Sequence, residues 1–237
     1  MSVDIVFFGA HPDDVEWGVG GIALHLGSKL SFVITDLTDG ELGSRGTPDQ
    51  RKVEAAAAAE FLGAAGRESL HLPDCGLVDL PENRRQIAAI VRRFRPAIVL
   101  APYWQDRHPD HAAAGLMVRN SQLYCTLKNS GDPNPPHKPG AFLFYPLNNF
   151  QSPTFVVDTS DVFERKLDLI RIHRSQFSKT AQEFGVLAHG VSDYIFGLES
   201  RDRYAGSLIG ARYGEALIAD QPVALRGMGD ILSLLRG

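Results

Sequence analysis

The sequence predicts an α/β protein with a Rossmann-like, doubly wound and mostly parallel sheet that carries helices on both faces. Two observations support this fold class. Short, continuous apolar runs, typical of strands buried on both faces, alternate with segments of helical periodicity. Right-handed crossovers between parallel strands then place the intervening helices on both sides of the sheet.

The elements of the first half follow this alternation in order. We expect strands at Ile5–Ala10, Leu30–Thr35, Ser69–Leu72 and Ala97–Ala101. We expect helices at Asp13–Leu26, Pro48–Leu62 and Glu82–Phe94, and from His108 to about Leu127.

The second half is less regular. Gly131–Gly140 holds four prolines and is expected to be a loop. Strands are expected at Phe142–Tyr145 and Thr154–Val157, and a helix at Asp161–His173. Because no repeat and no low-complexity linker divides the chain, we expect one domain over residues 1–237, with an irregular C-terminal elaboration from about residue 128.

Composition restricts the partners and the compartment. Charged residues make up 22% of the 237, and the formal net charge is −4, which disfavours broad binding to nucleic acid or to an anionic membrane. The sequence shows neither a signal-peptide pattern nor an apolar run long enough for a membrane span. Only two cysteines occur, Cys75 and Cys125, and both are expected to be buried small hydrophobes. These features predict a soluble, cytoplasmic protein.

Two segments of the chain share one design. The triplet His-Pro-Asp directly follows the first predicted strand as His11–Asp13, and it recurs shortly after the fourth as His108–Asp110. Proline suits the first position of a helix, so in each case polar residues stand where a strand ends and a helix begins. A single such corner is usually a helix cap, but its repetition at these two strands indicates a shared site.

The two corners are expected to meet. In the common doubly wound order the first and fourth strands are neighbours at the topological switch point, where ligands bind. This order gathers six side chains into one crevice: His11, Asp13, Asp14, His108, Asp110 and His111. Imidazole and carboxylate are the ligands of catalytic zinc, which takes three protein ligands and keeps one position open to water.

A glycine pattern offers a competing interpretation. Gly18–Ala23 fits G-x-G-x-x-A, the dinucleotide fingerprint, and would indicate a non-catalytic nucleotide-binding Rossmann protein. These glycines fall inside the predicted helix, however, and the preceding turn carries Asp13 and Asp14, which would repel a pyrophosphate. Close packing of the helix is the better account of the glycines.

The motifs resemble those of the LmbE/PIG-L family of zinc deacetylases. The resemblance rests on His11–Asp14 with Glu16 and Gly20-Gly21, and on His108–His111. Thr38–Thr47 with Arg51, and Tyr213–Ala216 with Pro222, are similar to the bacillithiol-biosynthesis branch, which deacetylates N-acetylglucosaminyl malate. The match is thin over residues 128–190.

The resemblance implies roles for individual residues. It implies that His11, Asp14 and His111 bind Zn²⁺, that Asp13 is the general base, and that His108 is a charge-stabilising or acid group oriented by Asp110. It places Tyr194 near the oxyanion. Either a protonated His108 or the proton that Asp13 has accepted could reach the leaving amine, and the sequence does not choose between them.

The substrate and the assembly are also expectations. Malate brings two carboxylates, for which arginine is the natural receptor, so Arg45, Arg51 and Arg107 are candidate substrate contacts, although Arg107 could instead brace the second corner. Mycothiol-type precursors, chitooligosaccharides and thiol conjugates are alternative substrates, and a catalytically silent metal-binding protein is a further alternative. Similar enzymes form trimers or hexamers, so the resemblance implies a homo-oligomer.

Overall fold

The protein is built around one seven-stranded sheet with the order β3-β2-β1-β4-β5-β7-β6. The computed structural model describes residues 2–27, 29–177, 191–224 and 227. The strands are β1 (Ile5–Gly9), β2 (Phe32–Asp36), β3 (Gly66–Ser69), β4 (Ile98–Pro102), β5 (Ala141–Tyr145), β6 (Phe155–Asp158) and β7 (Gly214–Ala219). The first five strands are parallel, and β7 is antiparallel to both of its neighbours. The predicted mostly parallel sheet is therefore confirmed.

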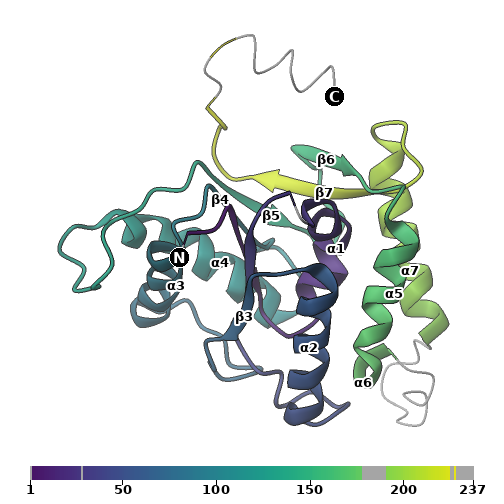
Figure 1. Ribbon diagram of the computed structural model, residues 1–237, viewed down its shortest axis with the longest axis horizontal. Helices are drawn as coiled ribbons and strands as arrows, with labels where there is room; N and C mark the ends of the chain where they lie inside the picture. The colour runs from purple at the N-terminus through teal and green to yellow at the C-terminus, as the bar shows by residue number, and fades with distance from the viewer. Residues whose placement is uncertain (1, 28, 178–190, 225–226, 228–237) are drawn as a thin grey trace.

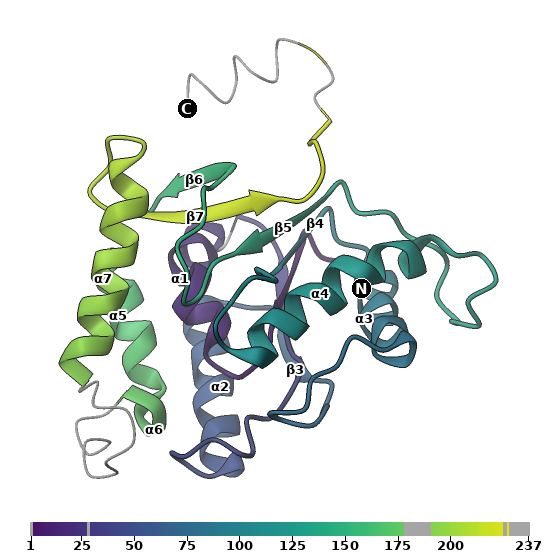
Figure 2. The same ribbon diagram turned by 180° about the vertical axis from the view of Figure 1, so that it is seen from behind.

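Helices cover both faces of this sheet (Figure 1). They are α1 (Asp14–Leu26), α2 (Pro48–Leu62), α3 (Pro81–Phe94), α4 (Pro109–Thr126), α5 (Phe163–Ile172), α6 (Arg174–Phe177) and α7 (Val191–Ser207). Figure 2 shows α3 and α4 together on one side of the sheet, with α1, α2 and α5 on the other.

Alternation along β1 divides the core into two layers. Val6 and Phe8 point to the cluster that α3 and α4 cover, whereas Ile5 and Phe7 point to the cluster under α1, α2 and α5. Successive side chains of a strand face opposite sides of a sheet, so a strand buried on both faces has to be apolar throughout. This requirement explains why the continuous apolar run was a reliable signal.

Two sequence expectations are wrong. The third strand is Gly66–Ser69 and not Ser69–Leu72. It is a half-buried edge strand whose sequence, GRES, carries none of the apolar signal of a central strand. Cys125 is buried as expected, but Cys75 is exposed, because it lies in the loop after β3 with a positive φ of 55°.

The C-terminal elaboration extends the sheet. β7 pairs with β5, β6 pairs with β7, and α7 packs against both of these added strands. Neither α7 nor β7 was predicted from the sequence. Within the described residues, no helix is long and apolar enough to cross a membrane.

Candidate metal centre and active site

The two His-Pro-Asp corners meet at the carboxyl edge of the sheet, as the doubly wound order requires. β1 pairs directly with β4, so the turns that follow these strands lie side by side. The imidazole rings of His11 and His111 are 5.4 Å apart between centroids, and those of His11 and His108 are 5.0 Å apart. The crevice predicted from the order of strands is therefore present.

Three side chains form a group that can hold a cation. Donor atoms of His11, Asp14 and His111 lie within 4.8 Å of one another, and all three residues are buried. Asp14 Oδ1 lies 3.2 Å from His111 Nε2, and Asp14 Oδ2 lies 3.6 Å from His11 Nδ1. The main-chain N–H groups of Ala10 and His11 also donate to Asp14 Oδ2, at 2.8 and 2.9 Å, so the turn after β1 fixes this carboxylate.

The outer nitrogen of each candidate imidazole ligand meets carboxylates. His11 Nε2 lies 3.1 Å from Asp74 Oδ1 and 3.2 Å from Asp110 Oδ2. His111 Nδ1 lies 3.3 Å from Asp106 Oδ1. A metal-binding histidine typically donates its other ring N–H to such a group, which fixes the tautomer and the ring orientation. The residues present therefore fit a divalent cation held by His11 Nδ1, His111 Nε2 and Asp14.

The electrostatics of this cluster favour a positive charge. Burial alone would lower the pKa of His111, but the carboxylates of Asp14 and Asp106 raise it to about 9. Burial also opposes ionisation of Asp106, yet hydrogen bonds from His111 and Asn148 lower its pKa to about 2. Neutral imidazoles surrounded by ionised carboxylates attract cations, whether protons or a metal ion.

Asp13 is held in an unusual conformation beside the cation group. It stands at the N-cap position of α1 with φ 138° and ψ −18°, yet its side chain makes no capping hydrogen bond. The interpretation of Asp13 as a simple helix cap therefore fails. A non-glycine residue in this region is strained, and such strain concentrates at functional sites. Burial raises the pKa of Asp13, and this rise is opposed by the Arg51 guanidinium and reinforced by Asp14.

His108 is anchored through the main chain. Its Nδ1 accepts the N–H of Asp110 at 3.2 Å, which makes His108 the N-cap of α4. The carboxylate of Asp110 faces His11 instead and accepts the N–H groups of Cys75 and Leu77. Asp110 thus orients His108 only through its backbone. Burial lowers the pKa of His108, and the neighbouring His111 and His11 lower it further.

A pocket of roughly 590 Å³ opens over this cluster. All of the predicted site residues except Asp110 line it, including Tyr194, Arg45, Arg51 and Arg107. Trp17 and Phe177 form part of its wall with their rings stacked 5.5 Å apart, and the Tyr194 ring meets both edge-on.

The three arginines differ in how they are engaged. The Arg51 guanidinium is buried and donates to the carbonyl oxygens of Gly40 and Pro12, at 3.0 and 3.1 Å. It also lies 3.5 Å from Asp13 Oδ1. Arg45 donates to the Gln176 carbonyl, and Arg107 makes one long contact, 3.5 Å, with Asn148 Oδ1. Arg45 and Arg107 are therefore freer than Arg51 to meet a ligand.

Sequence reasoning missed three polar residues of the site, Asp74, Asp106 and Asn148. Asp106 holds His111 and accepts the N–H of His108 at 2.7 Å, and Asn148 donates to Asp106 at 2.8 Å. Each of the three follows the carboxyl end of a parallel strand. That position is the signal that could have found them, because loops at this edge line the ligand crevice of a doubly wound sheet.

The fold and the candidate ligands together define a class of protein. It is an α/β protein whose residues are arranged to hold a divalent cation at the switch point of the sheet. The family model for PIG-L, GlcNAc-PI de-N-acetylase, matches residues 6–121. The diacetylchitobiose deacetylase of Thermococcus kodakarensis is 32% identical over 226 residues, which cover 87% of this chain and 79% of that protein.

Two solved structures are also similar. The conserved protein TT1542 from Thermus thermophilus matches with a TM-score of 0.84 and 35% identity, over 94% of this chain and 97% of that one. The N,N′-diacetylchitobiose deacetylase of Pyrococcus horikoshii, solved with an inhibitor, matches with a TM-score of 0.80 and 27% identity, over 91% of this chain and 83% of that one. The chain belongs to the PIG-L family of N-deacetylases.

Proposed function

We propose that this protein is a zinc-dependent hydrolase that removes the N-acetyl group from an N-acetylglucosamine conjugate, with N-acetylglucosaminyl malate as its preferred substrate. The observation that carries the proposal is the joint geometry of His11, Asp14 and His111 with the uncapped, strained carboxylate of Asp13 at the same pocket. Family membership supports the deacetylase chemistry.

The two adjacent aspartates divide the chemical work. His11, Asp14 and His111 would hold the zinc, which when bound lowers the pKa of water and polarises the amide carbonyl. Asp13 accepts the proton of the attacking water, because its carboxylate lies beside the cation group without a capping hydrogen bond. The buried guanidinium of Arg51, held by two carbonyl oxygens, lies against the Asp13 carboxylate and opposes the rise in its pKa that burial causes.

The leaving amine needs a proton, and the contacts favour Asp13 as its source. His108 Nδ1 accepts a main-chain N–H, which leaves Nε2 to carry the proton of the neutral ring. A lowered pKa keeps this ring neutral, so His108 donates a hydrogen bond to the developing oxyanion. Asp13 then passes the proton it has accepted to the amine. Tyr194 remains a predicted contributor on the oxyanion side.

The arginines support an anionic substituent on the sugar. Arg107 and Arg45 line the pocket, and within the described residues neither forms an ion pair with a carboxylate. A dicarboxylate attached to the sugar would supply the missing partners. Arg51 is not proposed to bind the substrate, because its guanidinium already contacts Asp13 and two main-chain carbonyl oxygens.

A neutral chitooligosaccharide is the second candidate substrate. The relative from Thermococcus kodakarensis is named a diacetylchitobiose deacetylase, and the aromatic wall of Trp17, Phe177 and Tyr194 could face either sugar. The two substrates differ in charge, so Arg107 and Arg45 discriminate between them. A homo-oligomer, trimeric or hexameric, is part of the same proposal, and size exclusion with light scattering tests it.

Acetate release tests the proposal directly. Zinc-loaded protein is given N-acetylglucosaminyl malate, diacetylchitobiose and N-acetylglucosamine in parallel, with a chelator-treated sample as the control. We expect zinc-dependent turnover with the highest kcat/KM on the malate conjugate. Faster turnover of diacetylchitobiose would overturn the malate assignment and keep the deacetylase. Zinc-independent turnover would overturn the metal assignment.

A further inference from the structure

Helix α1 is broken at Val19, two residues after Trp17, which lines the pocket. Val19 has φ −140° and ψ 28°, which interrupts the helix. In an unbroken helix the Gly21 N–H would donate to the Trp17 carbonyl, and the Ile22 N–H to that of Gly18. Here both N–H groups donate to the Glu215 carboxylate, at 2.7 and 2.6 Å. The Trp17 carbonyl accepts from Arg201 at 2.5 Å. Side chains from distant β7 and α7 thus replace the lost helical bonds.

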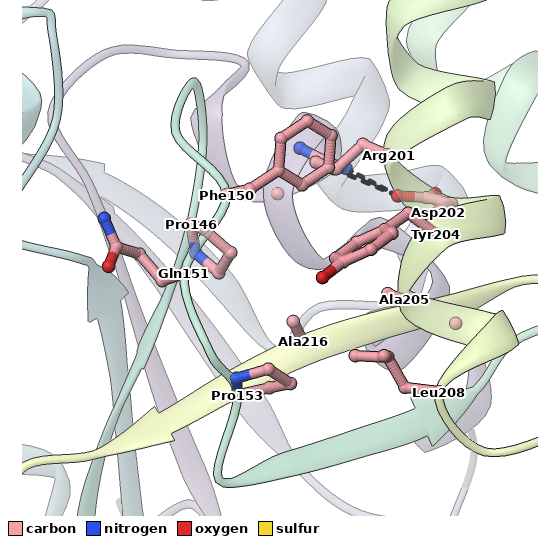
Figure 3. A pocket seen from close by; sticks show the side chains of 12 residues that line it. Pro146, Phe150, Gln151, Pro153, Arg201, Asp202, Tyr204, Ala205, Leu208 and Ala216 are labelled. Atoms are coloured by element: carbon pink, nitrogen blue, oxygen red, sulfur yellow. Dashed lines mark hydrogen bonds and ion pairs between the residues drawn. The ribbon is translucent and has the colours of Figure 1, made fainter.

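These side chains belong to a buried ion-pair network of Lys166, Arg201, Asp202 and Glu215. Lys166 Nζ lies 2.7 Å from Asp202 Oδ2 and also donates to Glu215. Asp202 Oδ1 in turn accepts from Arg201 at 2.9 and 3.0 Å. Figure 3 shows this ion pair between Arg201 and Asp202, two residues of α7 that line a small pocket. Because the two basic and two acidic groups balance, the network can stay buried without a further ligand.

Close packing surrounds the break in α1 on both sides. A Cβ added at Gly18 would lie 2.4 Å from the Tyr145 ring, and one at Gly21 would lie 2.8 Å from Thr159 and 2.9 Å from Glu215. The second half of α1 is therefore pressed against its neighbours. Kinks at glycine-rich points are a known response to such packing. The break separates the first turn of α1, whose Asp14 and Trp17 line the pocket, from the closely packed glycines that follow.

The first turn is consequently fixed at two places by different parts of the chain. Asp14 is held by the N–H groups of Ala10 and His11, in the turn after β1. Trp17 is held at its carbonyl by Arg201, and the Arg201 guanidinium also lies 5.5 Å from the Trp17 ring centroid. The metal group and the aromatic wall therefore depend on separate anchors.

We propose that Glu215 is a positioning residue for substrate binding. Together with Arg201 it stabilises the break in α1 after Trp17. Trp17 can then stack on Phe177 and complete the apolar wall against which a sugar ring lies. The identity of the sugar rests on the proposed function, whereas the coupling between Glu215 and Trp17 does not. Glu215 is buried behind α1 and lines neither the catalytic pocket nor the smaller pocket that adjoins it. Any effect on substrate must pass through the helix.

Kinetics of the Glu215→Gln variant test this assignment. The amide cannot accept both N–H groups, so we expect KM for the acetylated sugar to rise roughly tenfold, the effect of losing one charged hydrogen bond. Zinc content and kcat are expected to stay at their original values, because Asp14 keeps its own anchor. The matched control is Glu199→Gln, the same replacement at a partly exposed carboxylate of α7 paired with Arg203. A loss of zinc or a fall in kcat at unchanged KM would overturn the proposal.

A spectroscopic measurement separates this inference from the proposed function. In a Trp104→Phe background Trp17 is the single tryptophan, and its emission and acrylamide quenching report its position. We expect Glu215→Gln to shift both, and Glu199→Gln to shift neither. If the unaltered protein releases no acetate, the proposed function fails. The Trp17 emission and quenching still test whether Glu215 positions Trp17. If Glu215→Gln does not fold, Asp202→Asn takes its place, and Trp17 emission identical to the control overturns the inference.

Discussion

Two buried charge clusters of this protein differ in what completes them. At the switch point, His11 and His111 are surrounded by Asp14, Asp74, Asp106 and Asp110, and within the described chain no lysine or arginine contacts these four carboxylates. Behind α1, Asp202 and Glu215 are matched by Lys166, Arg201 and two main-chain N–H groups. The first cluster, called open here, lies at the large pocket and, among the described residues, has no lysine or arginine of its own. The second is called closed because its own basic groups balance its carboxylates, although Arg201 and Asp202 also line a small pocket.

The difference teaches how to separate a site from a structural network. Burying charge is costly unless it is compensated, so each cluster requires positive charge. The closed cluster obtains that charge from its own chain. The open one obtains it only from protons or from a bound cation, and its imidazoles offer ligand atoms that lysine and arginine do not. Residue types and balance of charge distinguish the candidate metal centre from the structural network.

Removing a ligand from the open cluster should have the largest effect. In Asp14→Ala the cation group loses its central carboxylate, so we expect bound zinc to disappear and acetate release to fall to background. Metal content measured after dialysis, together with turnover, checks this. A variant that keeps one zinc per chain would remove Asp14 from the ligand set.

Asp13→Asn should separate chemistry from metal binding at the same site. We expect kcat to fall by about 10²–10⁴, the usual contribution of a general base, while zinc content is retained. Steady-state kinetics beside metal analysis provide the test. Turnover within a few-fold of the original would show that another group accepts the proton.

Breaking the closed cluster should affect stability and leave zinc in place. Lys166→Met leaves Glu215 buried without a basic partner and Asp202 with Arg201 alone, so we expect about 3–5 kcal/mol of lost unfolding free energy. Urea unfolding measures the loss. The exposed pair of Arg171 and Asp168 provides the control, because Arg171→Met should cost less than about 1 kcal/mol. Equal losses in both variants would contradict the assigned burial cost.

The smallest effect on the site is expected from a change at Asp106, whose carboxylate contacts the candidate zinc ligand His111. Asp106→Asn removes the charge facing His111 Nδ1 and keeps the shape, so we expect zinc affinity to fall about 10- to 100-fold. Competition with a chromogenic chelator measures the affinity. The same replacement at exposed Asp168 should leave it unchanged, and an unchanged affinity in Asp106→Asn would mean that Asp106 supports only the turn before α4.

Sequence patterns predicted the parallel half of the fold and the centre of the site. The apolar runs around β1, β2 and β4 had to be continuous because those strands are buried on both faces. The two His-Pro-Asp corners were informative because strand order alone brings them together. The edge strand β3 gave no such signal, since its half-buried residues need not be apolar.

The sequence by itself determined the donor types, their place after β1 and β4, and the glycines that allow close packing of α1. The tertiary structure decided the rest, because the partners are distant in the chain. In the folded protein the carboxylate of Asp110 faces His11, and Arg51 contacts Asp13 and main-chain carbonyl oxygens. Asp74 and Asn148 also reach the site, where they contact His11 and His111. The tertiary structure also joined Glu215 to the break in α1 across more than 190 residues, a contact that no local pattern encodes.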